Sequence, residues 1–370
     1  MDGTVYMKSF QEEFADIKQL CESDDFKYEI ERTKQILSQK PLVLYGAGAV
    51  GVSVVRTLRH YGIEADCFCD KSKTGIQKET GLLIISPQVL ISDYADANII
   101  ICSVNYADEI RRDLFDLNIN QDRIFSRDSL LIHEMTIEDI EQYIAGYERV
   151  YSLYRDNRSK QIVLGRIKYY LTSLPLDSSP STNQYFDPEL ITPSCGEIFV
   201  DGGMYTGDTA ECFFEWVGVN YTHYYGFEPD GENYSFAMKN LEGRRNVTII
   251  QKGLWSGETQ LSFSGNLTSS SKLTDEESAG SIGVISLDEY FIDKEPPTFI
   301  KMDIEGAEFE ALKGAERIIR ENKPKLAVCA YHKPEDIYTL PELIKSFCVD
   351  YQFYLRHYTN FIYETVLYAL

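Results

Sequence analysis

The sequence predicts an α/β protein made of two α/β domains that a helical connector joins. Residues 41–130 and 196–370 alternate short apolar runs with segments of helical length, a pattern typical of parallel sheets with crossover helices. Between them, residues 136–172 lack Pro and carry apolar side chains at helical spacing. The Pro- and Ser-rich stretch at 175–196 then breaks that pattern and indicates a boundary. A length of 370 residues suits two domains.

The chain is expected to begin with a helical segment, residues 1–40. Phe10, Phe14 and Ile17 recur there at helical spacing, and the pattern ends before the Pro of PLVLY. The first α/β domain follows at 41–130. We expect its strands in the apolar runs PLVLY, ADCFCD, LLIIS and NIIICSV.

The helical connector is expected at residues 131–195 and the second domain at 196–370. The strands of the second domain are expected in EIFVDGG, HYYGFEPD, VTIIQKGLW, PTFIKMDIEG and KLAVCAYH. A polar, Ser-rich interval at 256–285 contains weakly alternating pieces such as TQLSFSG, and the tail adds YQFYLRHY and ETVLYAL. Each run ends in polar residues or Gly, which is where strands of this kind end.

Composition restricts the class of partner. The formal net charge is −22, and 44% of the residues are hydrophobic, as in a globular protein. The acid excess disfavours a nucleic acid and an anionic membrane surface, so a small molecule is the expected partner. Scattered cysteines, no export signal and no long apolar window favour a reduced, cytoplasmic protein. A homo-oligomer is left open.

Polar and Gly residues follow three of the strands expected in the second half. Asp201 begins the run DGGMYTGD, Glu228 ends GFEP, and Lys301 begins KMDIEGAE. Ligands of open α/β sheets bind beyond the carboxyl ends of the strands, and Gly lets the backbone pass close to a ligand. An acid that ends the second strand is placed to accept both hydroxyls of a ribose. The alternative for each motif alone is an ordinary turn or a helix cap.

Taken together, the runs DGGMYTGDT, GFEP, ISLDEYF and FIKMDIEGAEFEALKGA resemble the successive signatures of FkbM-type S-adenosylmethionine-dependent methyltransferases. The resemblance covers about residues 197–370. It implies that the second domain is a class I methyltransferase with a seven-stranded sheet, so both domains are Rossmann-like. Met204 departs from the family, which more often has a small residue there, but the D-x-G-x-x-x-G spacing is kept.

The same resemblance implies a cofactor site. Asp201, Gly203 and Gly207 would surround the methionine end of S-adenosylmethionine, Glu228 would bind the ribose, and Gly253 and Leu254 would lie near the adenine. The residues implied to bind the cofactor are Asp201, Gly202, Gly203, Tyr205, Gly207, Glu228, Pro229, Gly253, Leu254 and Asp303.

Methyl transfer to oxygen needs an aligned acceptor, a base for the hydroxyl proton and a pocket that excludes water. The expected catalytic residues are Asp303, His332, Lys301 and Glu305. His332 suits a general base by its ordinary pKa, and a helix-capping or supporting role is an equal alternative. The acids of this segment could instead hold Mg²⁺, but carboxylates in a first helical turn are favoured without any metal. The expected site therefore contains no metal, and Mg²⁺ stays open.

The first domain carries GAGAVG, with Gly46, Gly48 and Gly51 between an expected strand and helix, and Asp70 ends the next strand. This is the context of a nucleotide-binding fingerprint, although the motif alone is weak. The continuation FCDKSKTG and GLLIISPQVL resembles the nucleotide-sugar-binding N-terminal domains of PglD-type sugar acyltransferases. It implies a nucleotide sugar or an NAD-like ligand, and a ligand-free domain is the alternative.

We therefore expect an S-adenosylmethionine-dependent O-methyltransferase that acts on a hydroxyl of a sugar, nucleotide sugar or glycoconjugate precursor. The carbohydrate class of the substrate rests on the two resemblances. The alternative is a nicotinamide- or nucleotide-sugar-binding protein, an oxidoreductase or a sensor, that works through GAGAVG.

Overall fold

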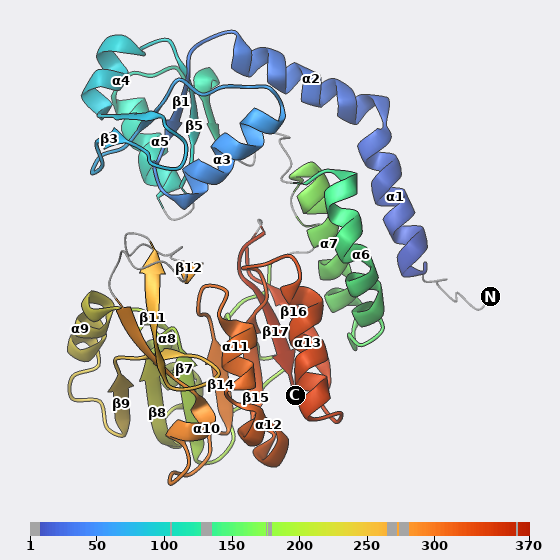
Figure 1. Cartoon of the computed structure of the whole chain (residues 1–370), viewed down its shortest axis with the longest axis vertical. Helices are drawn as coiled ribbons and strands as arrows, with labels where there is room; N and C mark the ends of the chain where they lie inside the picture. The colour runs from blue at the N-terminus through green and yellow to red at the C-terminus, as the bar shows by residue number, and fades with distance from the viewer. Residues whose placement is uncertain are drawn as a thin grey trace. The chain divides into compact units, whose positions relative to one another are not determined.

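The computed structural model describes residues 8–103, 106–126, 135–174, 176, 180–264, 272–273, 281–359 and 362–370. It divides into two compact units (Figure 1). The first comprises Met1–Glu141 and Arg166–Pro175, and the second comprises Gln142–Gly165 and Leu176–Leu370. The division passes within two helices, α6 (Ile137–Tyr151) and α7 (Asn157–Thr172).

The first unit begins with the two helices expected within residues 1–40. A capping box, in which Ser9 and Glu12 bond to each other's backbone N–H, starts α1, and the Ser23 side chain caps α2. Both helices bury an apolar stripe and expose a polar face. The helices are α1 (Phe10–Glu22), α2 (Asp24–Ser38), α3 (Ala49–His60), α4 (Pro87–Asp93), α5 (Ala107–Asp116) and η1 (Gln121–Arg123).

The described part of the first unit forms a six-stranded sheet in the order β3-β4-β2-β1-β5-β6. All neighbours pair in parallel except β3, which runs antiparallel to β4. The strands β1 and β5 are buried throughout, which is typical of the centre of a parallel sheet. The strands are β1 (Leu42–Tyr45), β2 (Cys67–Cys69), β3 (Gly75–Ile76), β4 (Leu83–Ile85), β5 (Asn98–Ile101) and β6 (Ile124–Ser126).

The second unit is built on a seven-stranded sheet in the order β16-β17-β15-β14-β7-β8-β9. The strands from β15 to β9 are parallel, and β17 is antiparallel to both of its neighbours. This confirms the expected seven-stranded class I methyltransferase sheet. The strand order reverses between β7 and β14, so ligands are expected at this point. The strands are β7 (Glu197–Gly202), β8 (Tyr221–Phe227), β9 (Val247–Ile250), β14 (Phe299–Met302), β15 (Lys325–Cys329), β16 (Phe353–His357) and β17 (Thr365–Ala369).

A smaller sheet in the order β10-β13-β11-β12 contains the alternating pieces of the polar interval. The expected run VTIIQKGLW divides between the two sheets, since its first part is β9 and its second part is β10. The strands are β10 (Gly253–Leu254), β11 (Thr259–Ser264), β12 (Lys272–Leu273) and β13 (Ser281–Ile285). The remaining helices are α8 (Asp208–Val217), α9 (Gly231–Asn240), α10 (Leu287–Tyr290), α11 (Glu308–Lys313), α12 (Glu316–Asn322) and α13 (Asp336–Phe347).

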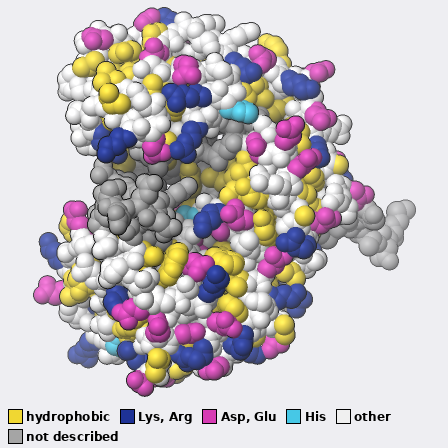
Figure 2. Space-filling model, in the orientation of Figure 1, with side chains coloured by type: hydrophobic (Ala, Val, Ile, Leu, Met, Phe, Trp, Pro, Cys, Tyr) yellow, Lys and Arg dark blue, Asp and Glu magenta, His cyan; other side chains and the backbone are white. Residues whose placement is uncertain are grey.

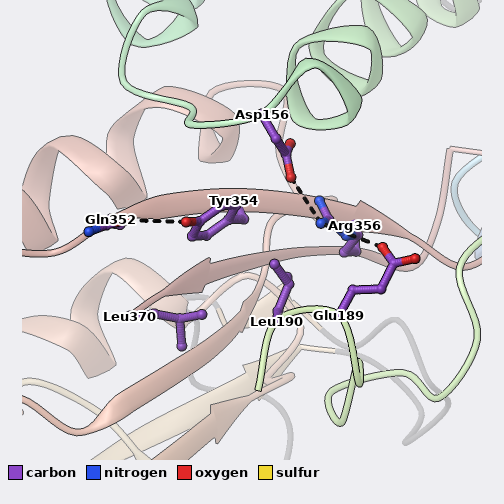
Figure 3. Close-up of a pocket in the computed structure, with 7 residues that line it drawn as sticks. All are labelled: Asp156, Glu189, Leu190, Gln352, Tyr354, Arg356 and Leu370. Atoms are coloured by element: carbon purple, nitrogen blue, oxygen red, sulfur yellow. Dashed lines mark hydrogen bonds and ion pairs between the residues drawn. The ribbon is translucent and has the colours of Figure 1, made fainter. Parts of the chain in front are cut away.

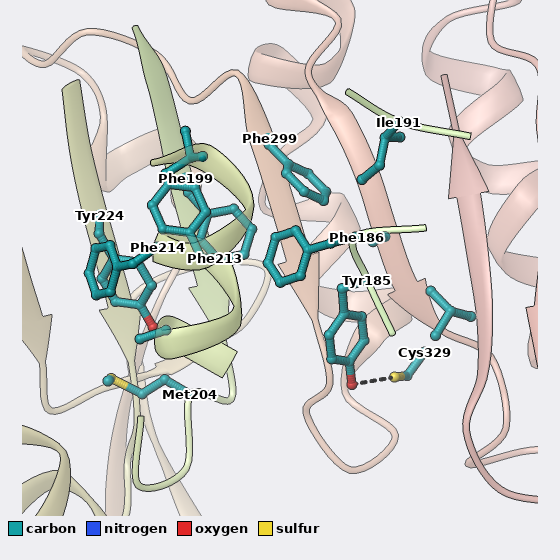
Figure 4. Packing of buried hydrophobic residues seen from close by; sticks show 14 of the residues in the cluster. Tyr185, Phe186, Ile191, Phe199, Met204, Phe213, Phe214, Tyr224, Phe299 and Cys329 are labelled. Atoms are coloured by element: carbon teal, nitrogen blue, oxygen red, sulfur yellow. Dashed lines mark hydrogen bonds between the residues drawn. The ribbon is translucent and has the colours of Figure 1, made fainter. Parts of the chain in front are cut away.

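Aromatic side chains fill the core between the large sheet and α8 (Figure 4). The rings of Phe199 on β7 and Phe213 on α8 stack with centroids 4.6 Å apart. Tyr185 and Phe186, from the Pro- and Ser-rich stretch, are buried in the same cluster. The stretch that breaks the helical pattern therefore contributes to the core of the second unit.

The surface carries charges of both signs. On the face drawn in Figure 2, Lys and Arg side chains are interspersed with Asp and Glu side chains. Within the described residues, every helix is too short or too polar to cross a bilayer.

Candidate active site

A buried ion pair lies beneath the loop that follows β7. Lys301 on β14 is in register with Asp201 on β7, and its Nζ donates to Asp201 Oδ1 at 2.9 Å. The Asp201 side chain is 0% exposed and that of Lys301 is 2% exposed. The second Asp201 oxygen accepts from the hydroxyl of Tyr224 at 2.7 Å. Asp201 therefore has a bonding partner at each oxygen and supports the loop from below.

Lys301 also holds the loop itself. Its Nζ donates to the carbonyl oxygens of Gly203 at 2.8 Å and Gly202 at 3.3 Å. Burial acts to lower the pKa of Lys301, but the carboxylates of Asp201 and Asp303 outweigh burial and raise it. The side chain is thus a fully bonded ammonium under the loop, which suits a positioning role.

The glycines of this loop are required by close packing. Gly203 has φ +72°, and a Cβ there would lie 1.8 Å from the carbonyl oxygen of Asp303. A Cβ on Gly202 would lie 2.7 Å from Leu254 Cδ1. Gly207 has φ +91° and precedes the first turn of α8. The ends of β7 and β14 therefore touch through backbone atoms, and only Gly leaves that space.

Glu228 ends β8 as expected and lies beside the same loop. Its Oε2 accepts from the backbone N–H of Tyr205 and its Oε1 from that of Asp230, both at 3.0 Å. The residue is 6% exposed, and burial raises the pKa of its carboxyl to about 7. The Asn233 side chain also donates to this carboxylate, and a carboxylate has about four acceptor positions, so acceptor capacity remains. Glu228 can therefore still accept the two hydroxyl protons of a ribose.

Pro229, Gly253 and Leu254 lie together at one side of Glu228. A Cβ on Gly253 would lie 3.7 Å from Pro229 Cγ, and Leu254 is buried against Gly202. The backbone N–H of Trp255 donates to Ile285, which ties this segment to the small sheet. These residues form an apolar wall next to the carboxylate, as an adenine site requires.

Asp303 follows β14 and is held by two tyrosines. Tyr185 donates to its Oδ2 at 2.8 Å and Tyr331 to its Oδ1 at 3.2 Å. Figure 4 shows the Tyr185 hydroxyl also reaching the sulfur of Cys329, at 3.5 Å. Burial acts to raise the pKa of Asp303, but the charges of Lys301 and His332 outweigh burial and lower it. Asp303 is thus an oriented carboxylate.

His332 follows β15 and lies among three acids. Its Nδ1 is 3.1 Å from Glu308 Oε1, and its Nε2 is 3.5 Å from Asp303 Oδ1 and 3.7 Å from Glu305 Oε2. Burial acts to lower the pKa of His332, but Glu308, Asp303 and Glu305 outweigh burial and raise it to about 9. The structure thus brings together three of the four expected catalytic residues, His332, Asp303 and Glu305.

Glu305 is the acid of this group that is open to solvent, with 43% of its side chain exposed. Its backbone has φ +56°, outside the range that most residues adopt, and partial burial raises the pKa of its carboxyl to about 7. Glu308 is buried, and its Oε1 accepts from the backbone N–H of Ile304 at 2.9 Å. Glu308 therefore closes the turn that leads into α11.

Two of the glycines of GAGAVG in the first unit are closely packed, and one lies beside open space. A Cβ on Gly46 would lie 2.7 Å from the carbonyl oxygen of Cys102, and one on Gly51 would lie 2.2 Å from that of Gly46. Gly48 precedes α3, and the nearest atom to a Cβ there would be Lys73 Nζ at 4.0 Å. Packing within the chain thus explains two of the glycines, and Gly48 faces open space.

Asp70 lies at the end of β2, next to this loop. Its Oδ2 accepts from the backbone N–H of Ala47 at 3.0 Å, and its Oδ1 accepts from Ser72 and Lys73. Burial acts to raise the pKa of Asp70, but these backbone donors outweigh burial and lower it. Its carboxylate therefore fastens the Gly loop to the neighbouring strand end.

Comparison with known families decides the class of the second unit. Residues 201–355 match the family model described as the methyltransferase FkbM domain. This part of the chain is similar to FkbM methyltransferase domains. The expected enzyme class, an S-adenosylmethionine-dependent methyltransferase, is thereby confirmed. Residues 38–125 match a model described as C2185-like, N-terminal, so the resemblance to PglD-type domains stays a prediction.

A solved structure with a TM-score above 0.5 shares the fold of this chain. A methyltransferase FkbM from Methylobacillus flagellatus KT is 22% identical, with a TM-score of 0.64, and the match covers 97% of this chain and 98% of that chain. A putative methyltransferase from Streptococcus mutans, solved with SAH, is 13% identical, with a TM-score of 0.31, and the match covers 48% of this chain and 92% of that one. No curated protein matches the chain.

Met204, the departure from the family pattern, has a packing partner in the methyltransferase domain. The residue is fully buried in the aromatic core. A Cβ on Gly226 would lie 2.3 Å from Met204 Sδ. The larger side chain therefore occupies space that Gly226 leaves on β8, and the loop keeps its course.

A separate pocket of about 550 Å³ lies at β16, near the C-terminus (Figure 3). Arg356 lines it, with its Nη2 2.9 Å from Asp156 Oδ2 and its Nε 3.5 Å from Asp187 Oδ2. The guanidinium is thus already compensated by two carboxylates. The pocket shares no residue with the expected cofactor or catalytic set.

Sequence reasoning missed three tyrosines of the methyltransferase domain site, namely Tyr185, Tyr224 and Tyr331. Tyr224 lies two residues before Gly226 on β8, so strand periodicity places its side chain on the same face. Tyr331 directly precedes His332, a neighbour already singled out. Tyr185 lies in an irregular stretch with no periodic signal. Only Tyr224 and Tyr331 could have been found from their positions.

Proposed function

We propose that the methyltransferase domain binds S-adenosylmethionine at the carboxyl ends of β7, β8 and β10 and methylates a hydroxyl of a carbohydrate. The observation that carries this proposal is the meeting of three strand ends at the point where the strand order reverses. There the Gly203 loop, the Glu228 carboxylate and the Asp303 carboxylate lie on adjacent strands. Such a point is where open α/β sheets bind ligands.

Each part of the cofactor has a matching group. Glu228 accepts the ribose hydroxyls, and Pro229, Gly253 and Leu254 form the apolar side for the adenine. The loop of Gly202, Gly203, Tyr205 and Gly207 encloses the methionine part, and its three glycines let the cofactor approach the backbone closely. Lys301 keeps this loop in place from below, because its ammonium donates to the Gly203 carbonyl oxygen while Asp201 holds the ammonium.

The acceptor hydroxyl is placed beside Asp303, on the side of β14 and β15. The Asp303 carboxylate, held by Tyr185 and Tyr331, orients the hydroxyl, and Glu305 takes its proton. Glu305 is chosen because it is the acid of the group open to solvent, so a substrate can reach it. Several carboxylates and tyrosine hydroxyls at one rim supply the acceptors and donors that a sugar needs, which supports the carbohydrate class.

Isothermal titration with S-adenosylmethionine tests the cofactor site. We expect Glu228→Gln to lower the affinity about 10- to 100-fold, because hydrogen bonds to a charged group contribute about 1.5–3 kcal/mol. Glu232→Gln, on the exposed first turn of α9, is the control and should leave the affinity unchanged. Equal affinities in wild type and Glu228→Gln would contradict the assignment of the ribose site. Transfer of a labelled methyl group to a panel of sugars and nucleotide sugars then tests the acceptor.

The affinity for the cofactor should depend on pH through Glu228. With a carboxyl pKa of about 7, Glu228 is mostly protonated at pH 5.5 and mostly a carboxylate at pH 8. The carboxylate is the form that accepts both ribose protons. We therefore expect the ratio of wild-type to Glu228→Gln affinity to rise between pH 5.5 and 8, by up to about tenfold per pH unit below 7. Protonation of the cofactor itself affects both proteins equally and drops out of the affinity ratio. A ratio that does not change with pH would contradict the role of Glu228.

For the first unit, we infer a phosphate-bearing ligand such as a nucleotide sugar at Gly48. The open space at Gly48, the N-terminus of α3 and Lys73 Nζ together suit a diphosphate. Titration with a UDP-sugar and with NADH tests this. Gly48→Glu should abolish binding, whereas Gly257→Glu, also in open space, should not affect it. Binding of NADH alone would favour the oxidoreductase alternative, and binding of neither would contradict a ligand in this unit.

A further inference from the structure

His332 is a buried side chain, 10% exposed, whose ring nitrogens lie near carboxylates. Within the described part of the chain neither nitrogen makes a well-aligned hydrogen bond, although Nδ1 is 3.1 Å from Glu308 Oε1. Glu308, 1% exposed, likewise has one oxygen, Oε2, without a partner. Buried polar atoms of this kind are rare, and a bound water or ion is one of the few things that explain them.

These atoms lie close enough together to share one cation. His332 Nδ1 is 3.1 Å from Glu308 Oε1, and Nε2 is 3.5 Å from Asp303 Oδ1, and one of these two nitrogens would be the ligand. One ligand atom from each of the three residues lies within 4.8 Å of the other two. Ligand atoms about 2.1 Å from a metal stand about 3–4 Å apart. Small side-chain rotations therefore suffice to bring all three onto one ion.

Neighbouring groups hold the two carboxylates and leave a ligand position free on each. Asp303 accepts from Tyr185 at Oδ2 and from Tyr331 at Oδ1, and Oδ1 has a further lone pair. Glu308 Oε1 accepts from the Ile304 N–H, so Oε2 is the free atom. Metal ligands are usually fixed in this way by bonds to their other atoms.

We propose that Asp303, Glu308 and His332 bind one divalent transition-metal cation of the Mn²⁺ class. One imidazole with two carboxylates suits such an ion better than Mg²⁺, which prefers an all-oxygen set. Glu305, 3.7 Å from His332 Nε2 and open to solvent, marks the side from which a substrate oxygen can complete the coordination. This inference goes beyond the proposed function, which names no cation. If the methyl acceptor binds as proposed, the cation would act as a Lewis acid on its hydroxyl.

Titration of the chelator-treated, full-length protein with Mn²⁺ alone, followed by the electron paramagnetic resonance signal of free Mn²⁺, tests the site. We expect one Mn²⁺ per chain. His332→Gln and Glu308→Gln should raise its dissociation constant more than tenfold, since loss of groups that merely orient ligands already costs 10- to 100-fold. Glu310→Gln is the matched control, because Glu310 lies on the same helix but pairs with the exposed Lys313. Its dissociation constant should equal that of the wild type.

Absence of stoichiometric Mn²⁺ binding to the wild type would overturn the site, as would equal dissociation constants in wild type and His332→Gln. Tryptophan fluorescence checks folding, and Asp303→Asn replaces any variant that does not fold. The cofactor titration is repeated in chelator. Absence of cofactor binding both with and without chelator, with stoichiometric Mn²⁺ binding retained, would contradict only the proposed function. Retained cofactor binding without any Mn²⁺ site would overturn only the cation site.

Discussion

Lys301→Met should lower the free energy of unfolding of the second unit by about 3–5 kcal/mol, the largest stability effect we expect. The substitution leaves Asp201 as an uncompensated charge at 0% exposure and removes the donor for the carbonyl oxygens of Gly202 and Gly203. Both tryptophans, Trp216 and Trp255, lie in the second unit, so urea unfolding followed by tryptophan fluorescence reports on this unit.

The control for this experiment is Lys313→Met. Lys313 also forms an ion pair with an acid, Glu310, but both side chains are partly exposed, so the expected loss is within about 1 kcal/mol. The double variant Asp201→Leu with Lys301→Met removes both charges and should recover part of the stability. A loss in Lys301→Met no larger than that in Lys313→Met would show that the buried pair does not hold the loop.

Gly203→Ala should disrupt the cofactor loop, with a loss of affinity for S-adenosylmethionine of more than about tenfold and a loss of stability of about 2–4 kcal/mol. The added Cβ would lie 1.8 Å from the carbonyl oxygen of Asp303, an atom of the backbone that cannot rotate away. The ends of β7 and β14 must then separate, which displaces the loop from Glu228. Isothermal titration and urea unfolding measure the two losses.

Gly243→Ala is the control that separates the strain of a positive φ from the steric clash of the added Cβ. Gly243 also has a positive φ, +80°, but a Cβ there meets no heavy atom within 4 Å. Its loss of stability should therefore be limited to the backbone term of about 1–2 kcal/mol, without any loss of affinity. Similar results for the two substitutions would mean that contact with Asp303 does not fix the loop.

The sequence predicted the fold because apolar runs of strand length alternate with helical segments in both halves. It could not assign each run to a sheet. Val247–Ile250 joins the large sheet and Gly253–Leu254 the small one, although both lie in one apolar run. The spacing of apolar residues and the length of a run indicate a strand. The strand that it pairs with depends on tertiary contacts.

The positions of Glu228, Asp303 and His332 near strand ends could be predicted, and their roles stay predictions. Lys301 was expected among the catalytic residues, and its burial beside Asp201 was not foreseen. Its position within the apolar strand FIKM was the available signal, because a Lys in a buried strand needs a paired acid. The pKa of His332 depends on three acids brought near by folding, which no local pattern reveals.

The contact between Tyr185 and Asp303 has a consequence for how this enzyme can be divided or recombined. The signature-bearing segment, 201–355, omits Tyr185, and it also omits β17, which lies between β15 and β16 in the sheet. A fragment cut at these limits would also lose most of β7, so it would expose edges of β15, β16, β14 and β8, and it would release Asp303 from Tyr185. The smallest transferable module therefore begins before Tyr185 and includes the last strand, so chimeras that exchange only the signature segment should fail to fold.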